Sequence, residues 1–211
     1  ASRTVYVIGA KAEFDSLAFN VAVFDQDIDG FQSNVFVGTG FVLANAGTQS
    51  VRGFEFDVNW APTEALRLSF ATTYLDPEYD DFVGGAGPDG PTDLSGTRPA
   101  GIHEWSTNTT GTYNFEFAGA TGYLRVEHVF EDEVQVIENV SAEIASREVS
   151  MFNASAGLSW PNGVELNLWG RNLNEDEYLL SAFPSVAQGG SFSGYPNTPR
   201  TYGLTVRKNF D

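Results

Sequence analysis

Hydrophobic side chains recur at every second position through nine stretches of the chain, most of them about ten residues long. In the clearest stretch, 53–60, four large apolar residues alternate with Gly, Glu, Asp and Asn. A period of two is typical of a β-strand whose two faces meet different surroundings. The pattern therefore predicts nine strands, at 5–14, 17–24, 53–60, 66–74, 113–117, 124–130, 152–160, 164–168 and 201–210.

The connections between these predicted strands alternate in length. Short turns are predicted at 15–16, 61–65, 118–121 and 161–163, and long polar links at about 25–50, 75–107, 131–150 and 172–200. Short turns at one end and long loops at the other are the arrangement of an outer-membrane β-barrel. The predicted fold class is therefore all-β, an antiparallel transmembrane β-barrel.

Aromatic residues on the apolar face gather at two heights along the strands. Those near the short turns are Phe14, Trp60, Phe117, Trp160 and Phe210, and those toward the long links are Tyr74, Phe130 and Tyr202. Two such bands match the aromatic girdles that mark the two membrane interfaces. A half-buried sheet of a soluble protein would also alternate, but it has no reason to sort its aromatic residues by height.

Charge and composition exclude several other classes. The chain has 11 basic and 28 acidic residues and a net charge of −17, which argues against a nucleic-acid partner because phosphate is met by Lys and Arg. It has no cysteine, so a disulfide scaffold, a thiolate metal site and a thiol nucleophile are excluded. No uncharged apolar run approaches the ~20 residues of a spanning helix, so contact with a bilayer would be made by strands.

Candidate metal and catalytic motifs are weak. Asp25, Asp27 and Asp29 resemble the start of a calcium loop, but Phe36 stands where a bidentate Glu should close it, so loop calcium is left open. His103 and His128 have no metal-ligand spacing. Without a serine elbow or carboxylates at a defined separation, we predict neither an enzyme nor a metal site nor a cofactor.

Two segments near the end of the chain carry a family resemblance. They are Gly170-Arg-Asn-Leu-Asn-Glu-Asp-Glu-Tyr178 and Pro199-Arg-Thr-Tyr-Gly-Leu-Thr-Val-Arg-Lys-Asn-Phe210, and 45–57 and 61–74 extend the likeness upstream. In this order, the segments resemble the C-terminal barrel region of a TonB-dependent outer-membrane receptor. The resemblance covers essentially the whole chain.

The resemblance implies a 22-stranded barrel in the bacterial outer membrane, closed by an N-terminal plug, that imports a scarce ligand such as a ferric siderophore. About nine strands are present, and an odd number of up-and-down strands cannot close into an antiparallel barrel. Residues 1–211 are therefore expected to be the C-terminal part of the barrel domain, without the plug and the N-terminal strands. Implied partners are the rest of the barrel, the plug, the TonB energy-coupling complex, the barrel-assembly machinery and the lipid bilayer.

Ligand contact in such a receptor is expected from extracellular loops and from residues near the strand tops. The candidates combine aromatic stacking with positive charge that an anionic ligand requires: Tyr79, Arg98, His103, Trp105, Tyr195 and Arg200. The glycine-rich runs 84–91 and 189–195 are expected to order around the ligand.

The sequence leaves several alternatives open. They are a small porin-like barrel, an outer-membrane hydrolase, and a soluble β-sandwich that binds carbohydrate. The identity of the ligand, whether siderophore, cobalamin or glycan, is also open at this level.

Overall fold

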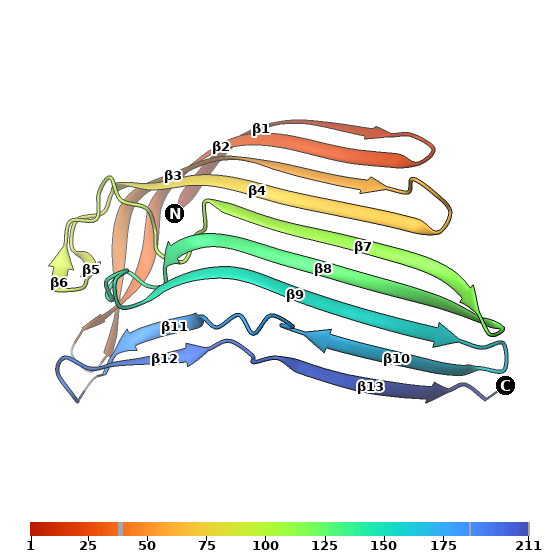
Figure 1. Ribbon diagram of the computed structural model, residues 1–211. Helices are drawn as coiled ribbons and strands as arrows, with labels where there is room; N and C mark the ends of the chain where they lie inside the picture. Colours follow the sequence, from red (N-terminus) through yellow and green to blue (C-terminus); the bar gives the residue numbers. More distant parts are fainter. Residues whose placement is uncertain (38–39, 186, 211) are drawn as a thin grey trace.

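The computed structural model describes residues 1–37, 40–185 and 187–210, and the side chains of these residues outside 33–46. The chain forms one curved antiparallel sheet of nine strands, in which spatial order follows the sequence (Figure 1). Its strands are β1 (Ser2–Glu13), β2 (Leu17–Val37), β3 (Gly40–Trp60), β4 (Leu66–Asp81), β7 (Trp105–Phe117), β8 (Ala120–Gln135), β9 (Ser146–Ser159), β10 (Val164–Arg171) and β13 (Thr201–Lys208). The all-β antiparallel fold and the nine predicted strands are confirmed.

Two small hairpins lie beside the main sheet at the end where the long connections gather. They are β5 (Gly85–Gly87) with β6 (Gly90–Thr92), and β11 (Leu179–Pro184) with β12 (Phe192–Pro196). Figure 1 places both at the left, opposite the short turns. No helix long and apolar enough to cross a membrane occurs in the described part of the chain.

The register of the sheet keeps the apolar residues of neighbouring strands on one face. Val23 pairs with Phe54, and Phe54 in turn pairs with Tyr74. At the other side of the sheet Leu166 pairs with Val206. Because side chains opposite each other project from the same side of a sheet, one face is apolar from β1 to β13 and the other is polar. We call these the outward face and the inner face.

The short turns are as tight as predicted. Phe117 pairs with Ala120, so only Ala118 and Gly119 connect β7 to β8. Both have positive φ angles, 51° and 73°, which a type I′ turn requires and which match the right-handed twist of the strands.

The predicted long link at 25–50 is wrong for the residues that are described. β2 and β3 continue through it as one hairpin, paired without a register shift to Val37 and Gly40. The period-two contrast disappears there because polar residues occur at both odd and even positions of the sequence, but the backbone groups still need partners and find them across the hairpin. Positions 38–39 of this link, and position 186 of the link 172–200, lie outside the described residues.

Buried apolar side chains gather at the loop end. One cluster holds Tyr79 and Phe82, against which Phe31 and Leu94 pack. A second holds Val140, Ala145 and Ala182, and so joins the β8–β9 connection to β11. These clusters fix the loops that border the inner face.

Candidate functional site

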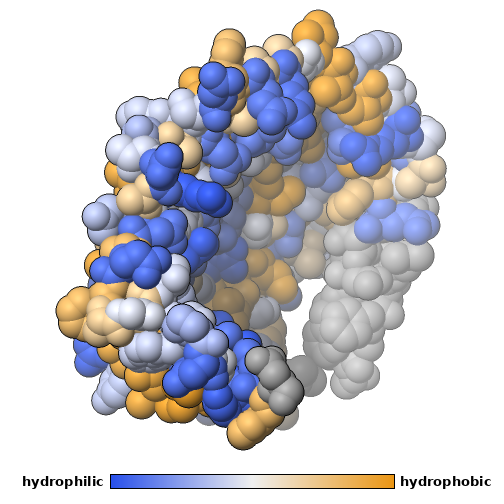
Figure 2. All heavy atoms as spheres, turned by 90° about the vertical axis from the view of Figure 1, so that its right-hand side faces the viewer, coloured by the Kyte–Doolittle hydropathy of each residue, from blue (hydrophilic) through white to orange (hydrophobic). Residues whose placement is uncertain are grey.

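Figure 2, which looks along the strands from the short-turn end, shows the hollow that the curved sheet partly surrounds. A recess of about 860 Å³ lies in its wall, formed by β8, β9, β10 and β13 and bordered by the segment 172–199. Its lining includes both basic and aromatic side chains, namely Arg125, Arg171, Arg207, Trp169 and Tyr178, together with polar residues such as Asn153.

The alternation along β10 places Trp169 and Arg171 side by side on the inner face. The Arg171 guanidinium carbon lies 5.8 Å from the centre of the Trp169 ring, within the range of a cation–π contact. Gly203 pairs with Trp169 on β13, and a Cβ there would come within 2.6 Å of the indole. The glycine therefore leaves the space that the tryptophan occupies.

The three arginines of the recess differ in their ion pairs. Arg125 lies 3.5 Å from Glu127, and Arg207 lies 3.5 Å from Glu165. Arg171 has no carboxylate partner among the described residues. Its planar cation, stacked on an indole and open to the hollow, is suited to bind a carboxylate, a catecholate or another planar anion.

The Arg-Asn-Leu motif holds this arginine through its asparagine. Asn172 is 2% exposed and has φ of 51°, a left-handed conformation that Asn tolerates better than most residues. Its Nδ2 donates to the carbonyls of Asp176 (2.8 Å) and Thr198 (3.2 Å), and its Oδ1 accepts from Asp176 N (2.8 Å). The side chain thus ties the end of β10 to the chain that leads into β13.

The residues that flank this asparagine tie the same segment to β9. Leu173 folds back over Gly170, where a Cβ would lie only 2.6 Å from the leucine Cδ2. Asn174 Nδ2 donates to the Ser150 carbonyl (2.6 Å), and Ser150 N donates to the Asp176 carboxylate (2.7 Å). The motif therefore fixes the segment after β10 to β9 and to the chain before β13, and in this way holds Arg171 at the recess.

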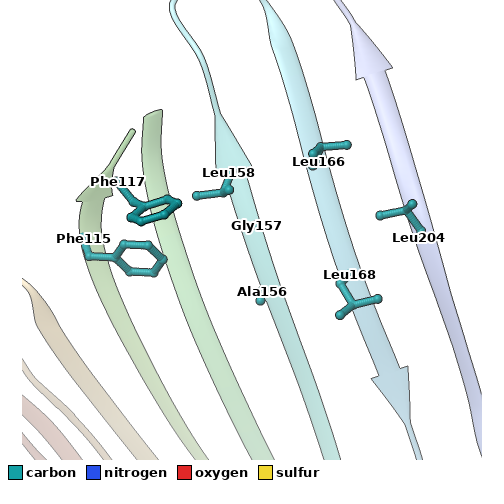
Figure 3. Close-up of a pocket in the computed structure, with 8 residues that line it drawn as sticks. All are labelled: Phe115, Phe117, Ala156, Gly157, Leu158, Leu166, Leu168 and Leu204. Atoms are coloured by element: carbon teal, nitrogen blue, oxygen red, sulfur yellow. The ribbon is translucent and has the colours of Figure 1, made fainter. Parts of the chain in front are cut away.

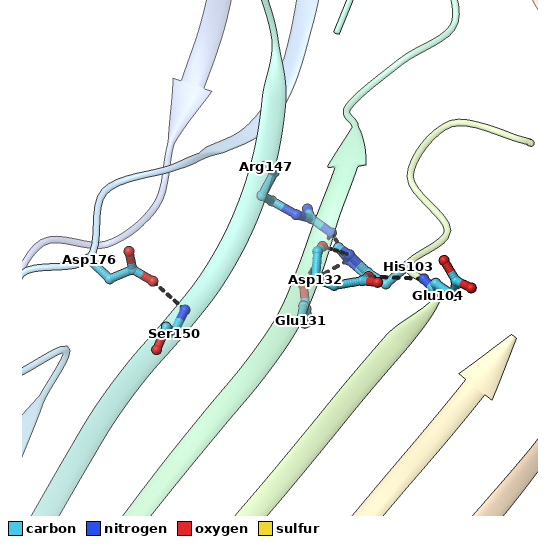
Figure 4. A network of polar contacts seen from close by, with 7 residues as sticks. All are labelled: His103, Glu104, Glu131, Asp132, Arg147, Ser150 and Asp176. Atoms are coloured by element: carbon cyan, nitrogen blue, oxygen red, sulfur yellow. Dashed lines mark hydrogen bonds and ion pairs between the residues drawn. The ribbon is translucent and has the colours of Figure 1, made fainter.

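A second polar cluster stands at the loop end of β8 and β9 (Figure 4). His103 Nδ1 donates to the Asp132 carbonyl over 2.9 Å, which fixes the ring. Its Nε2 lies 2.6 Å from an Arg147 nitrogen and 2.8 Å from a Glu131 oxygen.

The recess also contains the phenol of Tyr178. Burial, together with the negative charge of Glu131, raises the pKa of Tyr178. The phenol therefore stays protonated at neutral pH and can donate a hydrogen bond.

Two of the predicted ligand contacts have packing roles. Tyr79 is 3% exposed and donates its hydroxyl to Glu138 over 2.9 Å. Trp105 lies on the outward face, with its ring centre 4.9 Å from that of Tyr74.

The other four predicted contacts lie in or beside the loops. Arg98 is 3.2 Å from Glu104, and Arg200 is 2.7 Å from Glu175. Tyr195 is exposed on β12 beside Phe183, and His103 belongs to the cluster above. No hydrogen bond, ion pair or ring contact joins any two of the six predicted residues within the described chain.

The three aspartates of the calcium-like motif lie on β2 and not in a loop. Alternate residues of a strand share a face about 6.6 Å apart, so Asp25, Asp27 and Asp29 cannot wrap around one cation. Asp25 is paired with Arg52 at 3.2 Å. Among the described residues no group of three His, Asp or Glu side chains could hold a metal ion. Phe36, the closing position, has a side chain outside the described set.

Sequence reasoning missed Trp169 and Arg171. The signal was available, because a tryptophan on the polar parity of a strand with an arginine two positions later breaks the outward-facing rule for aromatic residues. The predicted ligand contacts lie in the loops and near the strand tops, whereas Trp169 and Arg171 belong to the strand wall.

Comparison with known proteins gives one family match. The model of the family described as TonB dependent receptor-like, beta-barrel, matches residues 4–173. A comparison with curated proteins finds no match.

Solved structures share the fold along nearly the whole chain. The ferric yersiniabactin uptake receptor FyuA from Yersinia pestis is 14% identical, with a TM-score of 0.79 over 99% of this chain and 30% of that receptor. The siderophore receptor PiuA from Acinetobacter baumannii is 21% identical, with a TM-score of 0.73 over 97% of this chain and 28% of that receptor. The copper transporter OprC is 15% identical, with a TM-score of 0.70 over 99% and 31%. The chain thus spans about 30% of the length of the receptors that it matches.

Proposed function

Because the chain belongs to the TonB-dependent receptor-like β-barrel family, as its resemblance predicted, we propose that it is a part of the barrel wall of an uptake receptor. TonB-dependent receptor barrels are outer-membrane proteins. In this proposal residues 1–211 form the C-terminal part of the barrel domain, and a plug and further strands complete it. The receptor imports a scarce ligand such as a ferric siderophore and carries out no chemistry on it.

The observation that carries the proposal is the Trp169–Arg171 pair in the recess. Ferric siderophores of the catecholate class combine negative charge with planar chelating groups, which a stacked guanidinium can bind through both charge and surface. Arg67 also has no carboxylate partner in the described structure, but only Arg171 is stacked on an indole in the recess, where its positive charge can bind an anion.

The loops complete the binding surface in this proposal. Arg98, His103, Tyr195 and Arg200 contact the ligand from above the recess, while Tyr79 and Trp105 hold the loops and strands in place. The runs 84–91 and 189–195 order around the ligand, so deletion of either run should leave barrel assembly intact and weaken uptake.

The proposed partners follow from the same placement. The remaining strands and the plug complete the barrel, the TonB complex supplies energy through the plug, and the barrel-assembly machinery inserts the chain. Lipid surrounds the outward face, and we propose no nucleic-acid partner for a chain with a net charge of −17.

The test is radiolabelled-iron uptake by cells that carry the full-length receptor, with a ferric catecholate and a ferric hydroxamate as probes. Arg171→Ala should lower the uptake of at least one probe about tenfold or more, the loss expected for a desolvated charged contact, while Arg171→Lys should retain part of it. Arg67→Ala is the matched control, because Arg67 also faces inward on β4, forms no ion pair in the described structure and does not line the recess.

Surface labelling must show equal amounts of all three variants. Unchanged uptake in Arg171→Ala, or an equal loss in Arg67→Ala, would contradict a role for the recess in ligand binding.

A further inference from the structure

The outward face has a groove of about 480 Å³ near the short-turn end of the sheet (Figure 3). Phe115 and Phe117 of β7 form one side, and Leu166 and Leu168 of β10 form the other. Ala156 of β9 lies between them as the floor. The lining is almost wholly carbon, so a polar ligand or a peptide backbone would find no hydrogen-bond partner in it.

Small residues between large ones create this groove. Ala156 pairs with Leu124 on one side and Leu168 on the other, so a methyl group is flanked by two isobutyl groups. Gly122 pairs with Phe115, and a Cβ at Gly122 would lie 2.6 Å from the phenylalanine ring. The ring therefore lies flat over the glycine and leaves the space beyond it open.

A single cation stands at the short-turn end of the groove. Leu166 pairs with Val206, and the next outward position on β13 is Lys208, about 6.6 Å further along the strand. The Lys208 ammonium donates to the Asn162 carbonyl in the β9–β10 turn and lies 5.7 Å from the Phe210 ring. In the described strands and turns it is the only Lys or Arg on the short-turn half of the outward face.

We propose that the groove and Lys208 together bind one anionic phospholipid. An acyl chain lies in the groove, where it covers apolar surface, and the lipid phosphate meets the lysine ammonium. Short turns of outer-membrane barrels face the periplasm, so the lipid belongs to the periplasmic leaflet. The inference rests on the proposed outer-membrane placement, but it does not depend on which ligand is imported.

The experiment uses the purified full-length receptor in nanodiscs of phosphatidylethanolamine. Spin-labelled phosphatidylglycerol and spin-labelled phosphatidylcholine with identical chains are the two probes, and the protein-immobilised fraction of each is measured at low salt. We expect phosphatidylglycerol to be favoured about fivefold at this site, the ratio that one lysine near a bilayer surface provides. Equal immobilisation of the two lipids would overturn the proposal.

Two variants test the contact with the lipid headgroup and the contact with the acyl chain separately. Lys208→Gln should abolish the preference for phosphatidylglycerol and leave some immobilisation of both lipids. Ala156→Trp fills the groove and should reduce the immobilisation of both. Ala154→Trp is the matched control, because Ala154 is the next outward residue of β9 and does not line the groove.

Heat-modifiable mobility must first show that each variant forms the barrel. A preference that persists in Lys208→Gln, or equal immobilisation by the Ala156→Trp and Ala154→Trp variants, would contradict the site. Iron uptake measured in cells that carry the same variants keeps the two proposals apart. Normal uptake without lipid preference would refute only the lipid site, and lipid preference without uptake would refute only the transport function.

Discussion

The two ends of the sheet are stabilised by different surroundings. Near the short turns the large apolar side chains lie on the surface, and Phe14, Phe117 and Phe210 are 63%, 62% and 87% exposed. At the loop end Tyr79, Phe82 and Val140 are almost fully buried. One end leaves its apolar groups for lipid to cover, whereas the other builds small cores of its own.

In the proposed outer-membrane placement, this difference follows from where water and lipid lie around the protein. Loops in water must bury apolar groups against each other to hold a conformation, since solvation by lipid is not available there. The membrane-facing strands need no such core, because backbone pairing and lipid contact stabilise them. Mutations at the two ends should therefore produce different kinds of damage.

The largest local effect is expected in the loop core. Phe82→Ala removes a ring packed against Tyr79 and should lower the free energy of local unfolding of the 75–104 region by about 3–5 kcal/mol. Amide hydrogen exchange of the full-length receptor should report faster exchange in that region and unchanged exchange in β7 to β10. Global loss of the barrel would contradict the independence of the two ends.

The next effect tests the two faces within one strand. Phe56→Arg, on the outward face of β3, should cost about 2–4 kcal/mol in folding into bilayers if the residue lies near the midplane. Glu55→Arg, one position away on the inner face, should fold nearly normally. The same contrast is expected for Phe70 against Ser69 and for Leu166 against Asn167. Urea titration in lipid vesicles measures it, and equal costs would refute the assignment of the faces.

A smaller effect is expected where the loop core meets a charge. Burial and the neighbouring Glu138 carboxylate raise the pKa of the Tyr79 phenol, which stays protonated and donates to that carboxylate. Tyr79→Phe leaves the ring but removes the donor, so it should cost about 1.5–3 kcal/mol of local loop stability. Protease cleavage rates in 75–104 would measure the loss. Glu138→Gln keeps an acceptor and should cost less than Tyr79→Phe.

The smallest effect is expected at the exposed Arg52–Asp25 pair on the outward face. Both side chains are exposed, and Arg52 pairs with Asp76 on the loop side of the girdle residue Tyr74. Arg52→Ala should therefore change stability by less than about 1 kcal/mol, with the remaining contribution screened by salt. A cost above that range in the same urea titration would mean that the pair is shielded from water, which would contradict its assignment to the solvated loop end.

Strands with a period-two alternation of apolar and polar residues can be predicted from the sequence, whereas a strand segment without that alternation cannot. Strands 53–60 and 66–74 could be located because large apolar residues alternate with small or polar ones along them. The continuation of β2 to Val37 was missed because polar residues occur at both odd and even positions of 25–37, so no period of two marks a strand there. The register between neighbouring strands cannot be predicted in the same way, because backbone hydrogen bonds do not depend on residue type and so are not visible in the sequence.

The candidate site was predicted less completely than the fold. Loop residues such as Arg98 and Arg200 were chosen for their chemistry, and the structure brings each to a carboxylate and none to another candidate. The recess depends on which strands adjoin it, and on Gly203 leaving room for Trp169. Such close approach between strands cannot be inferred from one sequence without knowledge of the register.

The most direct test of the two-faced wall is cysteine scanning of β4 from 66 to 74, which is convenient because these 211 residues contain no cysteine. Single cysteines in the full-length receptor, with any cysteine elsewhere replaced, would carry a nitroxide in lipid bilayers. Even-numbered positions should collide mainly with oxygen and odd-numbered positions mainly with a water-soluble nickel chelate. Collision rates without a period of two along this segment would contradict the account.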